Sequence, residues 1–106
     1  MAQVAIVEIK ERKGKNVEDY LSRPYVLLDR SGKEFTSIGF ARFLQERESV
    51  DFVIGGPYGV SDDVRNKAES IMSLSRMTFT HDMVRVFFLE QIFRAMTIIH
   101  GKEYHH

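Results

Sequence analysis

The sequence contains no cysteine, and its formal net charge is zero because 15 basic side chains balance 15 acidic ones. Without cysteine, disulfide bonds and thiolate zinc sites are excluded. The balanced charge gives no electrostatic sign of nucleic-acid binding. No uncharged apolar run approaches membrane-spanning length, and the N-terminus lacks the basic-then-apolar pattern of a secretion signal. We therefore expect a protein of the reducing cytoplasm, with no membrane partner and no metal site.

What the sequence does contain is typical of one globular domain. The chain has 106 residues, of which 43% are hydrophobic and eight are phenylalanine. This length is enough for one modest core, and the hydrophobic content excludes a disordered chain. No internal repeat or low-complexity segment divides it, so we expect a single domain over residues 1–106.

Short β-branched runs alternate with helical patterns and predict an α/β fold. Strands are expected at Val4–Ile9, Tyr25–Asp29 and Phe52–Ile54, and Ser73–Phe79 is expected to be a strand or an extended loop. Strands that are separated by helices form a mainly parallel sheet with helices on both faces.

Element boundaries are predicted from capping residues and apolar spacing. The candidate helix caps are Thr36 or Ser37, then Ser61, and finally Thr80, His81 or Asp82. The buried stripe of the second helix is expected to include Ile71 and Met72, and the last helix to run from Met83 to about His100. Arg30-Ser31-Gly32 is expected to close the second strand, and residues 17–23 to form two helical turns before Pro24 ends them.

A strand followed by a glycine-rich turn, Asp51–Val60, marks the candidate ligand site. The turn contains Gly55, Gly56 and Gly59, and Ser61 begins a helix directly after it. Glycine lets the backbone approach a ligand closely, and open α/β sheets bind ligands beyond the carboxyl ends of their strands. An ordinary strand-to-helix turn has the same composition, so both interpretations stay open on these residues alone.

The predicted last helix is apolar on nearly every side, whereas a surface helix needs only one apolar stripe. It is either a helix at the centre of the core or, as we favour, a helix whose second face packs on another copy in a two-fold dimer. Glu90 and Arg94 are spaced for an ion pair. Arg85 lies on nearly the opposite side and needs a partner, for which the candidates are Asp82, Asp29 or a bound anion.

Four motifs, in this order, resemble those of one family. They are Ile54-Gly55-Gly56-Pro57-Tyr58-Gly59, Ser73-Leu74-Ser75-Arg76-Met77-Thr78-Phe79-x-His81, Val84-Arg85-Val86-x-x-x-Glu90-Gln91-x-x-Arg94-Ala95, and Gly101-x-x-Tyr104-His105. From about Tyr25 to His106, the chain resembles the SPOUT-superfamily methyltransferases that act on pseudouridine N3 of large-subunit ribosomal RNA. It departs from the family at Thr80, where proline is common, and at Phe93, where tyrosine is common.

The resemblance implies a SPOUT-type α/β fold with a deep trefoil knot near the C-terminal half, and a homodimer through Met83–His100. It also implies that S-adenosylmethionine (SAM) is held in the knotted loops. By position, the cofactor-binding residues are Leu28, Gly56, Ser75, Arg76, Met77, Thr78, Phe79 and Thr80. The residues at RNA-side positions are His81 and Arg85, and the candidate catalytic residues are His105, Arg94, Glu90 and Tyr104.

The function implied by the resemblance is methylation of an unstacked base in the assembled ribosome. The base nitrogen must lose a proton, to His105 or to Glu90, and we favour His105. Family members usually carry a further strand and a basic helix at the front, so this chain is a trimmed, a designed or a naturally short relative. Two alternatives remain: a knotted homodimer that binds SAM without methylating, and a plain α/β interaction module. His106 is either native or a remnant of an affinity tag.

Overall fold

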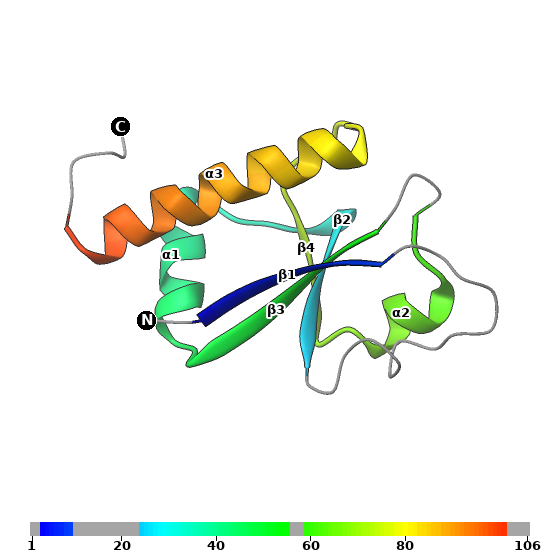
Figure 1. Cartoon of the computed structure of the whole chain (residues 1–106), viewed down its shortest axis with the longest axis horizontal. Helices are drawn as coiled ribbons and strands as arrows, with labels where there is room; N and C mark the ends of the chain where they lie inside the picture. Colours follow the sequence, from blue (N-terminus) through cyan, green and yellow to red (C-terminus); the bar gives the residue numbers. More distant parts are fainter. Residues whose placement is uncertain (1–2, 10–23, 56–58, 102–106) are drawn as a thin grey trace.

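The structure, a computed structural model of the chain, describes residues 3–9, 24–55 and 59–101. Within these ranges, no helix is long and apolar enough to cross a membrane. The order of strands and helices matches the prediction (Figure 1). The elements are β1 (Gln3–Ile9), β2 (Tyr25–Glu34), α1 (Ser37–Gln45), β3 (Ser49–Gly55), α2 (Asp62–Lys67), β4 (Ser70–Ser73) and α3 (His81–Ile99). The helical turns predicted at residues 17–23 lie outside the described residues.

The four strands form one parallel sheet in the order β1-β3-β2-β4. Leu28 of β2 lies opposite Ile54 of β3 on one side and Met72 of β4 on the other. The carboxyl ends of these three strands therefore meet at the same edge of the sheet. The parallel sheet with helices between its strands confirms the predicted α/β class.

Helices α1 and α3 pack together on one face of the sheet. Phe40 of α1, Phe52 of β3 and Phe88 of α3 are at most 2% exposed. The rings of Phe52 and Phe88 meet edge to face with their centroids 4.7 Å apart. Such a buried ring contributes about 3–5 kcal/mol relative to alanine, so this aromatic group holds the two helices on the sheet.

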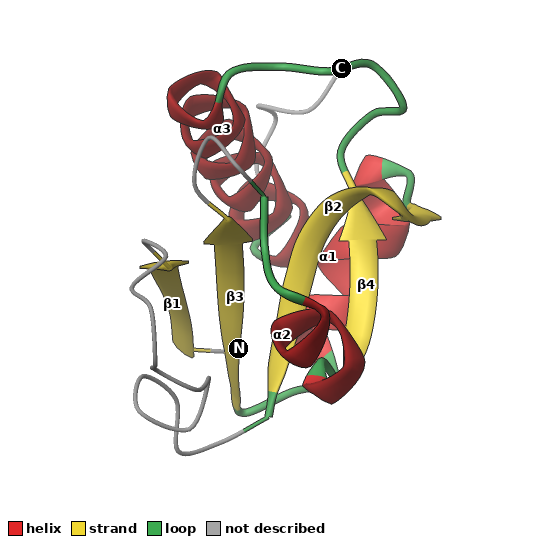
Figure 2. Ribbon diagram, turned by 90° about the vertical axis from the view of Figure 1, so that its right-hand side faces the viewer, coloured by secondary structure: helices red, strands yellow, loops and turns green. Residues whose placement is uncertain are grey.

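Helix α2 covers the opposite face (Figure 2). Val64 of α2 packs in a cluster with Tyr25 and Leu27 of β2, and the hydroxyl of Tyr25 donates to the carbonyl oxygen of Val64 at 2.6 Å. Val26 and Leu28, the alternate residues of β2, belong to the core under α1 and α3. The alternation of side chains along a strand thus divides β2 between two cores.

The helix starts are set by side-chain oxygens, as predicted. Thr36 caps α1, Ser61 caps α2 and Thr80 caps α3. Each accepts a hydrogen bond from the backbone N–H three residues further on, at 3.0, 3.3 and 3.4 Å respectively. Thr80 therefore supplies a cap at a position where the family commonly has proline, which has no side-chain oxygen.

The predicted end of the second strand is wrong. The strand does not stop at Arg30-Ser31-Gly32 but continues to Glu34, with an irregularity in its pairing to β4 between Leu28 and Lys33. A Cβ at Gly32 would lie 2.5 Å from the carbonyl carbon of Ile71, so the glycine permits close contact between the two strands. Residues 30–32 have no partner of their own on β4, and the pairing resumes at Lys33 and Glu34, so the turn-like segment interrupts the ladder without ending the strand.

The predicted extent of the second helix is also wrong. Helix α2 ends at Lys67, and Ile71 and Met72 belong to β4, not to a helical stripe. Of the two alternatives for Ser73–Phe79, the loop is confirmed: β4 lies earlier, at Ser70–Ser73, and residues 74–80 form a loop that leads to α3. A strand of only four residues is too short to show its own periodicity.

Helix α3 is buried on one side only. Phe88, Ala95 and Thr97 are buried, so the interpretation as a helix at the centre of the core is wrong for the single chain. An outward row, which we call the α3 apolar face, is 43% to 55% exposed and consists of Met83, Val86, Leu89 and Phe93.

Candidate functional site

A cavity of about 940 Å³, which we call the first cavity, lies where the carboxyl ends of β2, β3 and β4 meet. Its walls come from residues 28–30, from residues 54–60 without the undescribed 56–58, and from the connection between β4 and α3 together with the first residues of α3. Open parallel sheets bind ligands at this edge. Its volume is within the range of small-molecule sites, roughly 300–1,000 Å³.

Most of the predicted cofactor residues line the first cavity: Leu28, Ser75, Met77, Thr78, Phe79 and Thr80. His81, which the resemblance assigns to the RNA side, lines the same cavity. Arg76 does not line it, because its side chain is 82% exposed and its Nε lies 3.1 Å from Oε1 of Glu34. Gly56 lies outside the described residues.

The glycine turn is close-packed at the cavity edge. A Cβ at Gly55 would lie 2.7 Å from Cγ1 of Val60, and Gly59 has a φ of +79°. Only glycine tolerates this approach and this backbone conformation without strain. Both glycines also line the first cavity. The turn conformation and the position at the cavity edge occur at the same residues, so the turn interpretation does not exclude the ligand prediction.

Serine hydroxyls shape the loop that follows β4. The hydroxyl of Ser73 donates to the carbonyl oxygen of Ser75 at 2.9 Å, and Oγ of Ser75 accepts from the N–H of Met77 at 3.0 Å. Such local bonds fold a short segment without a backbone ladder. From β2, Nη1 of Arg30 donates to Oγ1 of Thr78 at 2.9 Å.

Asp29 contributes a fixed negative charge to the cavity wall. Its two carboxylate oxygens lie 3.2 and 3.3 Å from the guanidinium nitrogens of Arg65 on α2, and the N–H of Ser31 donates to it at 3.0 Å. Burial raises the pKa of Asp29, but the hydrogen bonds from Arg65 and Ser31 outweigh it and lower the pKa from 3.8 to about 2. The same pairing raises the pKa of Arg65. Asp29 is therefore charged at neutral pH and does not serve as an acid.

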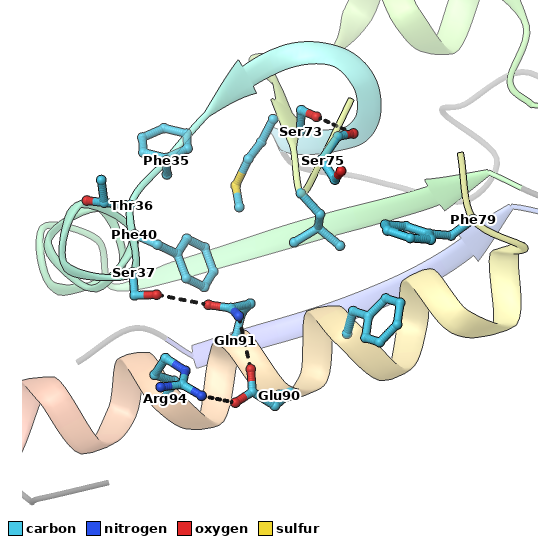
Figure 3. Close-up of a pocket in the computed structure, with 13 residues that line it drawn as sticks. Phe35, Thr36, Ser37, Phe40, Ser73, Ser75, Phe79, Glu90, Gln91 and Arg94 are labelled. Atoms are coloured by element: carbon cyan, nitrogen blue, oxygen red, sulfur yellow. Dashed lines mark hydrogen bonds and ion pairs between the residues drawn. The ribbon is translucent and has the colours of Figure 1, made fainter. Parts of the chain in front are cut away.

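A second cavity, of about 500 Å³, lies between α1, α3 and the loop after β4 (Figure 3). Leu74, Ser75 and Phe79 line both cavities, so they form a shared wall. The ring of Phe79 meets that of Phe87 edge to face at 5.0 Å. An aromatic pair thus lies at the wall that the two cavities share, with Phe87 on the side of the second cavity.

The second cavity holds two of the candidate catalytic residues. Nη2 of Arg94 lies 2.6 Å from Oε1 of Glu90, which confirms the predicted ion pair. The amide of Gln91 donates to the other oxygen of Glu90 at 3.0 Å and accepts from the hydroxyl of Ser37 at 3.3 Å. This hydrogen-bonded row joins α3 to α1 and orients the carboxylate of Glu90 (Figure 3).

Arg85 lines neither cavity. Its Nη1 lies 2.8 Å from Oε1 of Glu8 on β1, and its Nη2 lies 3.6 Å from Asp82. The prediction of Asp82 as a partner is confirmed, and that of Asp29 is wrong because Asp29 pairs with Arg65. The side chain is 46% exposed and is not a buried charge. Tyr104 and His105 lie outside the described residues.

Several lining residues were not predicted. Asp29 and Arg30 follow the paired part of a strand, and the rule that ligands bind beyond strand ends would have identified them. Ser37 and Gln91 meet only because α1 packs on α3, and no spacing in the sequence indicates this. In the part of the chain that the structure describes, no group of three or more acidic or histidine side chains could hold a metal ion.

The fold and the first cavity define a parallel α/β protein whose ligand site is built from the loops after three adjacent strands. The chain belongs to the SPOUT methyltransferase family. The family profile described as "Predicted SPOUT methyltransferase" matches residues 2–105.

Similar proteins carry the name Ribosomal RNA large subunit methyltransferase H. The protein of Christiangramia forsetii is 51% identical over 86 residues, which cover 76% of this chain and 55% of that protein. The protein of Flavobacterium johnsoniae is 45% identical over 104 residues, with coverages of 92% and 66%. That of Thermodesulfovibrio yellowstonii is 42% identical over 115 aligned positions, with coverages of 99% and 79%. The chain thus spans less than two thirds of the length of the first two.

Proposed function

We propose that this chain is a SAM-dependent methyltransferase that modifies N3 of a pseudouridine in large-subunit ribosomal RNA. The observation that carries the proposal is the first cavity, where six of the eight positions that the resemblance assigns to the cofactor meet. Membership of the SPOUT methyltransferase family supports the reaction class. The names of the relatives support ribosomal RNA as the substrate.

The first cavity fits SAM in size and in lining. Leu28, Ile54 and Leu74 offer apolar contacts to a flat purine ring, while Ser75 and Thr78 offer hydroxyl groups to the polar parts. When bound, SAM supplies a methyl group on a positively charged sulfonium that already contains its leaving group. The protein therefore has to align the methyl group with the base nitrogen.

The remaining work of the chain is to hold the base and remove its proton. His105 is our preferred general base and Glu90 the second candidate. Arg94 and Gln91 hold the Glu90 carboxylate in one orientation, through contacts of 2.6 and 3.0 Å. Arg94 also carries the charge that binds a phosphate or a carboxylate, and Tyr104 completes the catalytic set.

The proposal includes a homodimer through α3 and a trefoil knot in the C-terminal half, as the resemblance implies. The exposed α3 apolar face supports the dimer, because contiguous exposed apolar surface marks interaction sites. The net charge of zero supports a target in the assembled ribosome, where other components supply much of the docking surface. The protein then acts in the cytoplasm. No specific observation favours a dimer without activity or a plain interaction module.

Calorimetric titration with S-adenosylhomocysteine is the first test. We expect saturable binding at the first cavity. Replacing Gly55 with alanine should weaken binding at least about tenfold, because the new Cβ would push against Val60, which lines the same cavity. Gly39→Ala in α1, outside the first cavity, is the matched control and should bind like the wild type.

A second measurement follows transfer of a labelled methyl group from SAM to large ribosomal subunits. If a folded wild-type chain does not bind S-adenosylhomocysteine, the cofactor assignment is wrong. Binding without methyl transfer to ribosomes would instead contradict the enzymatic part of the proposal and leave a cofactor-binding protein.

A further inference from the structure

The last five residues of β2, Arg30–Glu34, form a segment that we call the β2 extension. It bends across the carboxyl end of β4, where the pairing between the two strands is irregular (Figure 2). Gly32 approaches the backbone of Ile71 so closely that no Cβ would fit. Irregularities of this kind change the direction in which strand side chains point, and they are common next to binding sites. The extension therefore packs closely against β4, the strand that precedes residues 74–80.

Two side chains of the β2 extension reach the cavity loop, residues 74–80. Nη1 of Arg30 donates to Oγ1 of Thr78 at 2.9 Å, and Oε1 of Glu34 lies 3.1 Å from Nε of Arg76. The extension therefore contacts the loop at two points, one near its start and one at its end.

The cavity loop depends on side-chain contacts for its shape. In the described part of the chain, residues 75–79 form no backbone–backbone hydrogen bond outside regular elements. Segments with few such bonds belong to the least stable parts of a fold. Yet Ser75, Thr78 and Phe79 supply a large part of the wall of the first cavity.

The other side of the β2 extension is anchored independently. Asp29 and Ser31 both bind the guanidinium of Arg65 on α2, with contacts of 3.2 to 3.3 Å. The extension is therefore fixed to the body of the protein and is able to hold the loop in turn.

Of the two loop contacts, the one from Arg30 has the greater effect on the cavity. Both Arg30 and Thr78 line the first cavity, whereas Arg76 does not. The side chains of Glu34 and Arg76 are 51% and 82% exposed, and exposed ion pairs contribute little.

We propose that the β2 extension is a clasp that holds the cavity loop in its cofactor-binding conformation, with Arg30 as the positioning residue through Thr78. The inference rests on the proposed function and adds a residue that neither the motifs nor the family resemblance assigns to the site. Arg30 acts through Thr78, so it tunes cofactor affinity and leaves the chemical step unchanged.

The test compares Arg30→Met, Arg30→Lys and Thr78→Val by calorimetry with S-adenosylhomocysteine. Arg30→Met should weaken binding about three- to tenfold, the effect of one lost hydrogen bond. Thr78→Val should weaken binding at least as much, because it removes both the partner of Arg30 and a hydroxyl that we assign to SAM. The double variant should bind no worse than Thr78→Val alone, because the contact with Arg30 is already lost there. Arg30→Lys keeps a donor and should restore most of the affinity. At saturating SAM, kcat of Arg30→Met for ribosome methylation should match that of the wild type.

Amide hydrogen exchange of a peptide covering residues 75–79, without ligand, provides a second and independent measurement. Arg30→Met should speed this exchange, whereas Arg42→Met, at an exposed arginine of α1, should not. Wild-type affinity in Arg30→Met would overturn the clasp. If the wild type itself bound no S-adenosylhomocysteine, the proposed function would be wrong. The clasp would then be tested by hydrogen exchange alone, and unchanged exchange in Arg30→Met would overturn it.

Discussion

Asp29 of β2 lines the first cavity, and its carboxylate forms an ion pair with Arg65 of α2. This one interaction links the strand to the helix at the edge of the cavity. The carboxylate is partly buried, which disfavours its charge, but the two-point contact with the guanidinium and the bonds from Ser31 outweigh this cost. Geometry of this kind is the condition under which an ion pair contributes to stability.

We expect Asp29→Asn to lower the free energy of unfolding by about 1 kcal/mol at neutral pH, after allowance for screening by water. The folded-state pKa of about 2 lies below the ordinary value of 3.8. The contribution is therefore fully present above the ordinary value and is lost as the pH falls through about 2. Urea unfolding of both proteins at a fixed protein concentration, over a series of pH values, measures this difference.

Asp63→Asn is the matched control, because Asp63 pairs with Lys67 on the same helix and its side chain is 42% exposed. Its effect should stay within about 0.5 kcal/mol. A difference between wild type and Asp29→Asn that did not shrink towards low pH would contradict the assigned pairing.

Residue-level prediction from the sequence succeeds where the interaction is local. The caps Thr36, Ser61 and Thr80 and the pair of Glu90 with Arg94 follow from spacings of three or four positions. The contact of Arg85 with Glu8 could not be predicted, because it depends on β1 lying beside the start of α3 in space.

At the scale of elements, β2 shows that a turn-like segment need not end a strand. Arg30-Ser31-Gly32 has the composition of a turn and has no partner of its own on β4, yet β2 resumes its pairing with β4 at Lys33 and Glu34. Pairing with Leu27 and Leu28 of β2 places Ile71 and Met72 in β4, although their spacing from Val64 also suits a helix. Strand and helix assignments from short apolar runs are ambiguous for this physical reason.

Gly32→Ala should destabilise the protein by about 1–3 kcal/mol, because the added Cβ forces the backbones of β2 and β4 apart. The thermal unfolding midpoint and urea unfolding both measure this effect. The nearby exposed Lys33→Ala should cost less than about 1 kcal/mol. Equal stability of Gly32→Ala and the wild type would contradict the close approach of the two strands.

At the scale of the whole molecule, the α3 apolar face exposes large apolar side chains to solvent, and the fold of a single chain gives no structural reason for this exposure. Phe93 is 55% exposed and Val86 is 54% exposed, on a helix whose opposite side is buried against the core. The proposed dimer buries this face and accounts for the two apolar sides of the helix.

The double variant Val86→Ser, Phe93→Ser should convert the proposed dimer into a monomer, because it replaces apolar contact area on the α3 apolar face with hydroxyl groups. Sedimentation velocity at micromolar concentration measures the change. Ile38→Ser removes a side chain of similar exposure, 50%, from α1 and should leave the dimer intact. A wild-type protein that sediments as a monomer would contradict the proposed dimer.

The fold class and the position of the first cavity could be predicted because both depend on the order of the elements. Strands alternating with helices give a parallel sheet, and the glycine turn after β3 indicates the edge where the first cavity lies. The second cavity could not be predicted, because Ser37, Glu90 and Gln91 come together only when α1 packs on α3.

The wall shared by the two cavities provides a physical route for linkage between their occupants. Phe79 and Ser75 face both, so any occupant of one cavity that shifts these side chains also reshapes the other. By linkage, the factor by which one occupant changes the affinity of the second equals the factor by which the second changes the affinity of the first. Two adjacent ligands would then bind as cooperative or competing partners without touching one another.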